Sequence, residues 1–256
     1  MARKAAKRKS KQVSIEYIED NVIAMKQGPK RKSWSVLDIK NIKPMTESQR
    51  SMIESYLSGA NIVGTGSPGT GKTYIALWLA LNTIFSTETP QNKIIIVRSL
   101  VQTRDMGFIK GSNEEKAAPF EAPYHDICSE LLGKPSSYQD LKDANKIEFL
   151  NTSFIRGISK SDAVIIIDEV QSMNFHEISS ILTRVGKNSK VIVVGDKKQD
   201  DLLSYNKKMD KSGYDQFIQI ANHMKEFDII YFTPEDIVRS GFVKSFVSAC
   251  EYFDIL

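Results

Sequence analysis

The stretch "GTGSPGTGKTYIALWLA", residues 64–80, places glycines directly in front of an apolar run with the character of a helix. Glycine disfavours helices, so a glycine-rich segment at this point needs a reason. Gly66-x-x-x-x-Gly71-Lys72-Thr73 fits the phosphate-binding loop pattern, and an apolar strand, Ile62–Thr65, precedes it. In such a loop backbone N–H groups converge on phosphate oxygens, and the helix N-terminus adds its unsatisfied donors and positive dipole end. The stretch therefore predicts a strand, a phosphate-binding loop and a helix.

Each residue type in this loop has a chemical role. Lys72 is expected to reach the β- and γ-phosphates, and the Thr73 hydroxyl to ligate Mg²⁺. ATP and Mg²⁺ are therefore the expected cofactors. The predicted nucleotide-binding residues of the loop are Gly66, Ser67, Pro68, Gly69, Thr70, Gly71, Lys72 and Thr73.

Two acids follow a second apolar strand, in "IIIDE" at residues 165–169. In phosphoryl-transfer sites a carboxylate at the end of a neighbouring strand holds Mg²⁺, and we assign that role to Asp168. Glu169, next in the chain, is suited to orient and deprotonate a water molecule. The pair predicts hydrolysis, whereas a small-molecule kinase would place its base against a substrate hydroxyl and would need a lid rich in arginine.

A third strand, Val191–Val194, ends in Gly195-Asp196, and Gln199 follows three residues later. The carboxyl ends of parallel strands meet at one edge of a sheet, where ligand sites of α/β proteins form. We therefore expect Gln199 to contact the γ-phosphate or the attacking water. The alternative is an ordinary loop amide.

Short β-branched runs alternate with helical patterns over most of the chain, which predicts an α/β fold with a three-layer parallel sheet. Most of these runs are continuously apolar, as expected for strands buried on both faces. The expected helices include 73–85 and 175–185. The expected strands are 62–65, 94–97, 147–150, 164–167, 191–194 and 228–231.

The N-terminal segment differs in charge from the rest of the chain. Residues 1–32 carry ten Lys or Arg and three Asp or Glu, a net charge of +7, although the whole chain of 256 residues has only +4. We therefore divide the chain into a basic, flexible arm with its linker, 1–42, and a folded domain, 43–256. Such an arm can contact nucleic-acid phosphates, or it can be a solvated tail.

Other classes of protein are disfavoured by composition. Cys128 and Cys250 are the only cysteines and form no C-x-x-C pattern, so neither a disulfide framework nor a zinc site is expected. The longest apolar run, residues 74–81, is far shorter than the ~20 residues of a membrane span. We expect a cytoplasmic protein with no membrane partner.

At these residues the sequence resembles the phosphate-starvation-inducible PhoH-like proteins, which are related to the ATPase core of superfamily 1 helicases. The resemblance runs from about Met45 to Tyr252 and departs from the usual family residues at Ser99 and within 104–111. It rests on the loop and on "VRSLVQTRDMGFIKGSNEEKAAPFEAPYHDI", "IIIDEVQS", "ILTRVG", "VVGDKKQDDL", "KSG" and "DIVRSGFVKSFVSACEYF".

The resemblance implies a RecA-like P-loop NTPase domain, a homo-oligomeric and by preference hexameric ring, and a role with RNA. It also implies that Gln49, 17 residues before Gly66, contacts adenine, because an amide can both donate and accept. The alternative for Gln49 is an exposed helix glutamine.

One RecA-like domain leaves its nucleotide at an open sheet edge, so a transition-state arginine would come from a neighbouring subunit. Arg239 and Arg184 match family positions and are the candidates for this catalytic role. Arg98 and Arg156 follow strands and are expected at the sheet edge of their own subunit. The candidate nucleic-acid contacts are these two residues and Arg3, Lys4, Lys7, Arg8, Lys9 and Lys11 of the arm.

These observations predict an ATP-binding and ATP-hydrolysing protein that depends on RNA or single-stranded nucleic acid, with possible helicase or remodelling activity. The alternative is a nucleotide-gated ring scaffold that holds RNA or protein without productive unwinding. A general base at Glu169 distinguishes them, because a pure binder does not require one.

Overall fold

The computed structural model divides the chain into two units, residues 1–35 and 36–256. In the first unit β1 (Val13–Ile18) and β2 (Val22–Gln27) pair as antiparallel strands. The second unit begins at Val36, whereas the sequence predicted a start of the folded domain at residue 43. The residues before 43 belong to this unit because Ile39 is buried and Lys40 N donates to Leu131 O at 2.7 Å. The structure describes residues 13–18, 22–27, 34–100, 113–152, 160–196 and 212–253, with side chains from 34 onward except at 113–116 and 251.

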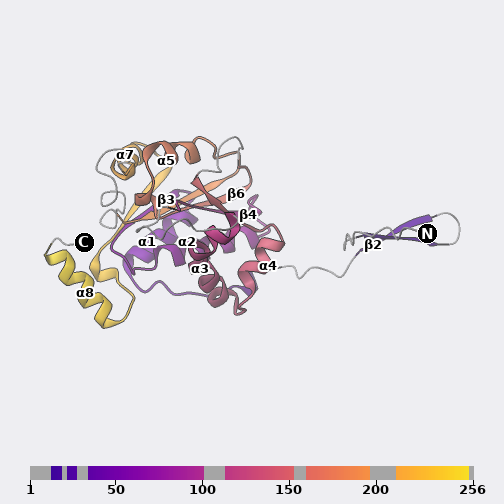
Figure 1. Ribbon diagram of the computed structural model, residues 1–256, viewed down its shortest axis with the longest axis horizontal. Helices are drawn as coiled ribbons and strands as arrows, with labels where there is room; N and C mark the ends of the chain where they lie inside the picture. Colours follow the sequence, from indigo (N-terminus) through magenta and orange to yellow (C-terminus); the bar gives the residue numbers. More distant parts are fainter. Residues whose placement is uncertain are drawn as a thin grey trace, which may run out of the picture. The chain divides into compact units, whose positions relative to one another are not determined.

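The second unit is built on one six-stranded sheet in the order β5-β4-β6-β7-β3-β8, with every neighbouring pair parallel (Figure 1). All six predicted strands are present, and no predicted boundary differs by more than one residue. The strands are β3 (Asn61–Gly66), β4 (Lys93–Arg98), β5 (Ile147–Asn151), β6 (Ala163–Asp168), β7 (Lys190–Gly195) and β8 (Phe227–Phe232).

Helices cover both faces of this sheet, which confirms the three-layer α/β fold (Figure 1). One face carries α1 (Glu47–Leu57), α2 (Lys72–Phe85), α3 (Asn113–Leu132) and α4 (Ser137–Asp143), and the other carries α5 (Phe175–Leu182) and α7 (Tyr214–Ala221). Helix α5 ends three residues before the predicted boundary because Val185 pairs with Lys160 in a β-bridge. Among the described residues, the remaining elements are α8 (Gly241–Tyr252) and the 3-10 helices η1 (Val36–Asp38), η3 (Val170–Ser172) and η5 (Pro234–Asp236).

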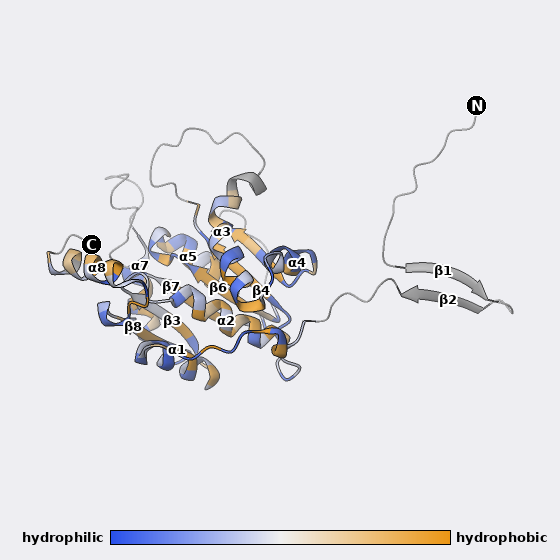
Figure 2. Ribbon diagram, turned by 90° about the horizontal axis from the view of Figure 1, so that it is seen from below, coloured by the Kyte–Doolittle hydropathy of each residue, from blue (hydrophilic) through white to orange (hydrophobic). Residues whose placement is uncertain are grey.

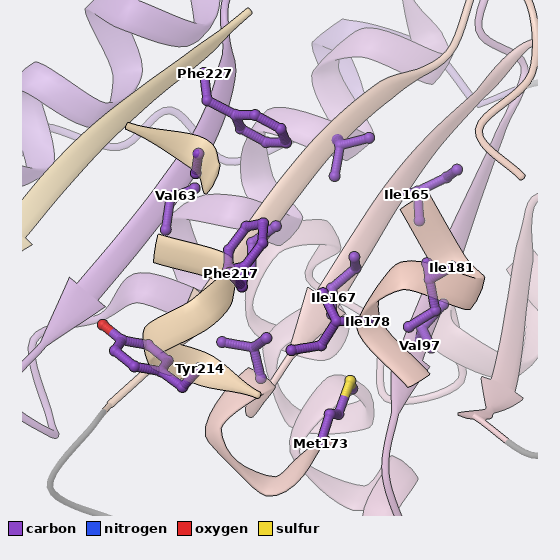
Figure 3. Close-up of a cluster of buried hydrophobic side chains, with 14 of the residues drawn as sticks. Val63, Val97, Ile165, Ile167, Met173, Ile178, Ile181, Tyr214, Phe217 and Phe227 are labelled. Atoms are coloured by element: carbon purple, nitrogen blue, oxygen red, sulfur yellow. The ribbon is translucent and has the colours of Figure 1, made fainter. Parts of the chain in front are cut away.

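The continuous apolar runs of the strands are explained by burial on both faces. In β6, Ile165 and Ile167 face α5 and α7, and Ile166, on the opposite face, is 1% exposed. Figure 2 shows the central parts of β4 and β6 coloured as hydrophobic. Figure 3 shows the core on the α5–α7 side, where Phe217 and Ile178 pack over the strands. Burial on both faces fixes the strand register and therefore the side chains at the carboxyl edge.

That register decides which residues meet. Arg98, the last residue of β4, lies opposite Asp168, the last residue of β6. One strand, β7, separates β6 from β3, and α2 packs against both β6 and β7. The helix that begins at Lys72 therefore starts beside the acid that ends β6.

Candidate active site

The loop between β3 and α2 has the backbone that its glycines predict. Gly66, Gly69 and Gly71 have φ values of 117°, 74° and 82°, in the positive range that favours glycine. A Cβ at Gly66 would also overlap the carbonyl oxygen of Phe232 on the neighbouring strand β8. The loop therefore needs glycine at residue 66 for its conformation and for the close approach of β8.

Other segments of the same chain hold the loop in place. Ser67 N donates to Phe232 O at 3.0 Å, and Val238 N donates to Gly69 O at 3.1 Å. Gln49 Nε2 donates to Thr70 O at 2.9 Å. Hydrogen bonds from α1, β8 and the segment after η5 fix the backbone of the loop, so the loop is preorganised for a ligand.

Lys72 opens α2 and points its ammonium into the loop. Its Nζ donates to Gly66 O at 2.6 Å and to Ser67 O at 2.7 Å. Burial lowers the pKa of Lys72, while the charges of Asp196, Glu169 and Asp168 partly counter this effect. A phosphate group at the loop would replace the carbonyls as partners of this cation, because an anionic oxygen attracts an ammonium more strongly than a neutral carbonyl does.

Thr73, in the first turn of α2, and Asp168, at the end of β6, are in direct contact. Thr73 Oγ1 donates to Asp168 Oδ1 at 3.1 Å, and Oδ1 also accepts from Glu169 N at 3.1 Å. Burial raises the pKa of Asp168 and the neighbouring Glu169 charge adds to this, whereas hydrogen bonds and the Arg98 guanidinium oppose it. A hydroxyl and a carboxylate oxygen side by side form a donor set that suits Mg²⁺.

Glu169 occupies a strained turn directly after β6. Its φ of 53° and ψ of 47° are left-handed, which is uncommon for a residue other than glycine. Its carboxylate accepts a hydrogen bond from Gln171 Nε2 at 2.6 Å, and its side chain is 35% exposed. The carboxylate is thus held in one orientation and still reaches the surface of the site.

Arg98 lies within this acidic centre. Its guanidinium is 3.9 Å from Glu169 Oε1 and stands over the ring of Phe120 at 5.7 Å. Burial alone would lower the pKa of Arg98, but Tyr124, Asp168 and Glu169 outweigh that effect and raise it. The sequence placed Arg98 at the sheet edge among nucleic-acid contacts, and in the structure it lies beside the two acids.

The other arginines lie in different places. An added Cβ at Gly69 would be 3.0 Å from Arg239 Cγ, so Arg239 lies against the phosphate loop of its own chain. Arg184 donates to Ser180 O at 2.6 Å, at the C-terminal end of α5 and the opposite edge of the sheet from the loop. Only Arg239 thus lies beside the loop of its own chain, and a role for either arginine in a neighbouring subunit stays a prediction.

Gln49 is 4% exposed and not the surface glutamine of the alternative interpretation. Its Oε1 accepts from Met45 N at 2.9 Å, and its Nε2 binds the loop at Thr70 O. Its amide thus supports the loop from α1, and contact with adenine stays a prediction. The remaining predicted site residues, Gln199, Arg156 and the six basic residues of 1–12, lie outside the described part of the chain.

Two site residues were given no role by the sequence. Tyr124, from α3, donates its hydroxyl to Asp168 Oδ2 at 2.6 Å and is 1% exposed. Gln171, from η3, contacts Glu169 on one side and the end of β7 on the other. Both belong to quoted stretches, "EAPYHDI" and "IIIDEVQS", but only the tertiary structure shows what they contact.

A glycine loop that holds a lysine, followed by a threonine in contact with the acid of a second parallel strand, defines the P-loop NTPase fold, and by its fold this chain belongs to that class. Residues 41–251 match the profile of the PhoH-like protein family, and the chain is a member of that family. In the described part of the chain no helix is long and apolar enough to cross a membrane.

The chain is similar over 211 residues, 82% of its length, to the PhoH-like proteins of Mycobacterium leprae and Synechocystis sp., with identities of 29% and 31%. The matched region spans 58% and 62% of those relatives. Among solved structures, a large terminase from a thermophilic bacteriophage, in complex with ADP, is similar at 13% identity and a TM-score of 0.42, covering 79% of this chain and 49% of that one.

Proposed function

We propose that this chain binds and hydrolyses ATP with Mg²⁺, at the carboxyl edge of its sheet. The observation that carries the proposal is the hydrogen bond between Thr73 Oγ1 and Asp168 Oδ1, with Glu169 next to it. These oxygens belong to the two elements that P-loop enzymes use to hold the metal. The preorganised loop and its buried lysine support binding of a triphosphate.

Each residue has one task in this proposal. Lys72 and the loop amides bind the phosphates, and Thr73 with Asp168 would hold Mg²⁺, which when bound neutralises charge that develops on the phosphates. Glu169 orients a water molecule and accepts its proton as the water oxygen bonds to the γ-phosphorus and the bond to ADP breaks. Gln199 is assigned to the γ-phosphate or the attacking water on sequence grounds.

We further propose that RNA or single-stranded nucleic acid stimulates this hydrolysis. The support is the family resemblance and the net charge of +7 in residues 1–32. Helicase or remodelling activity would use the ATP cycle, whereas a ring scaffold would use nucleotide binding alone.

Assembly as a ring, by preference hexameric, belongs to the same proposal. The position of Arg184 on the far edge of the sheet supports it as the arginine that one subunit offers to the site of another. Mixing two inactive variants, Lys72→Ala and Arg184→Ala, restores part of the hydrolysis if the site is shared. No recovery in mixed oligomers verified by light scattering would refute a shared site.

The test of function is phosphate release from ATP by the full chain, with and without Mg²⁺ and with RNA, single-stranded DNA or duplex DNA. We expect Mg²⁺-dependent release that RNA or single-stranded DNA increases, and no release by Lys72→Ala. Wild-type turnover in Lys72→Ala would refute the assignment of the loop. ATP binding with no release under any condition would favour the scaffold.

A further inference from the structure

A single buried amide, that of Gln171, joins Glu169, the acid directly after β6, to Asp196, the residue directly after β7. Gln171, in η3, is 2% exposed and has both ends of its amide engaged. Its Nε2 donates to Glu169 Oε2 at 2.6 Å, and its Oε1 accepts from Asp196 N at 3.0 Å. We propose that Gln171 is a positioning residue of the hydrolytic site: its amide holds the Glu169 carboxylate in place relative to the end of β7. This inference rests on the proposed role of Glu169.

The chemistry of the two partners fixes the orientation of the amide. The backbone N–H of Asp196 is a donor, so it must face the amide oxygen, and the ionised carboxylate of Glu169 accepts only, so it must face the NH₂ group. A flipped amide would oppose two donors on one side and two acceptors on the other. Glutamine therefore satisfies both partners at once, which neither glutamate nor lysine can do.

The main chain leaves space for this amide. A Cβ at Gly195 would lie 2.6 Å from Gln171 Oε1 and 2.6 Å from Val170 Cγ1. Gly195 is not among the residues with positive φ, so its backbone does not require glycine. The missing side chain at the end of β7 therefore leaves space for both the Gln171 amide and the Val170 side chain of η3.

The local backbone also directs the acid toward this amide. Glu169 is left-handed, a conformation that is unfavourable for a residue other than glycine. Glu169 and Gln171 are only two positions apart in the chain, and the turn between them brings their side chains into a hydrogen bond. Strain that persists at a functional position indicates that the surrounding structure fixes it, and the amide bridge is one such contact.

A neutral amide suits the proposed chemistry better than a cation would. The Arg98 guanidinium, which pairs with Glu169, is 3.9 Å from Oε1, beyond hydrogen-bond distance. A contact ion pair would hold the carboxylate equally well but would weaken it as a base, because an adjacent positive charge stabilises the ionised form. Gln171 therefore orients the Glu169 carboxylate through a neutral donor and adds no further positive charge beside it.

The test measures ATP turnover of Gln171→Ala beside a matched control. Misplacement of a reacting group by about 1 Å costs up to ~100-fold, so we expect kcat to fall about 10- to 100-fold with KM for ATP within about threefold of wild type. Gln91→Ala is the control, because Gln91 is also buried and its Nε2 donates to Asn188 O at 2.8 Å, at the other edge of the sheet. Its kcat should stay at the wild-type value.

A double variant separates positioning from a merely structural role. If Gln171 acts through Glu169, adding Gln171→Ala to Glu169→Gln lowers kcat no further. If Gln171→Ala does not fold, Gln171→Glu keeps the shape but loses the donor, and the same loss of kcat is expected.

Four results would contradict the inference: full turnover in Gln171→Ala, an equal loss in Gln91→Ala, a change confined to KM, or additive losses in the double variant. An inactive Glu169→Gln beside a fully active Gln171→Ala overturns the inference alone. A fully active Glu169→Gln overturns the proposed base, and the inference with it.

Discussion

The turns after β3 and after β6 both contain residues with positive φ angles, but the residue types differ. After β3 the chain needs positive φ angles and no side chains, and glycines supply them at residues 66, 69 and 71. After β6 it needs a positive φ and a carboxylate together, and Glu169 adopts the left-handed conformation despite its Cβ. In the proposed function the first turn binds through its backbone, and the second acts through a side chain. On that proposal, strain is retained at the residue whose side chain does the chemistry.

The largest expected effect comes from a side chain placed in the glycine turn. Gly66→Ala would combine a positive φ, which costs about 1–3 kcal/mol, with overlap of its Cβ and Phe232 O. Gly59→Ala is the matched control, because Gly59 has a φ of 111° but an added Cβ there would meet nothing within 4 Å. Urea unfolding should show that the free energy of unfolding of Gly66→Ala falls by about 1–3 kcal/mol more than that of the control. Equal losses would mean that β8 does not constrain the loop.

The next effect tests the support of the acid turn from α3. Tyr124→Phe removes the hydrogen bond to Asp168 Oδ2, and Tyr138→Phe removes a similar buried bond, from Tyr138 to Glu121 Oε2 at 2.7 Å. Tyr124→Phe should lose about 1–3 kcal/mol of stability, because Asp168 Oδ2 loses a buried donor. Tyr138→Phe should lose less, because Glu121 Oε2 still accepts from Lys142 Nζ at 2.8 Å. Only Tyr124→Phe should change the Mg²⁺ concentration that half-saturates ATP turnover. The same shift in Tyr138→Phe would place the effect in α3 as a whole.

The smallest effect measures the strain itself. Glu169→Gly and Glu169→Ala both remove the carboxylate, but only glycine relieves the left-handed strain. Glu169→Gly should therefore be more stable than Glu169→Ala by about 1 kcal/mol, and both should lose hydrolysis. Chemical denaturation of the two variants compares them directly. An alanine variant as stable as the glycine variant would show that the turn carries no strain.

The sheet was predictable because its signals are local. Six runs of β-branched residues mark the strands, and the loop pattern marks the first strand–helix turn without further context. The paired strands β1 and β2 were not predicted, because the charge of residues 1–32 favoured a flexible arm.

The site was only partly predictable, because several of its contacts join residues far apart in the chain. The two acids at the end of β6 follow from the strand pattern, but the contact of Tyr124 with Asp168 depends on how α3 packs. Arg98 lies beside the acids because β4 and β6 are neighbours in register, and strand order is not written in any single motif. Arg239 and Gln49 contact the loop from segments that only folding brings together.

Single-turnover hydrolysis by Glu169→Gln, with ATP affinity measured on the same sample, tests the central claim most directly. A general base contributes about 10²- to 10⁴-fold, so the variant should bind ATP with wild-type affinity and hydrolyse it at least ~100-fold more slowly. The amide keeps the size of the side chain and removes its basicity, so loss of the fold does not account for the result. Hydrolysis at the wild-type rate would contradict the account, because Glu169 would then have no part in the chemistry.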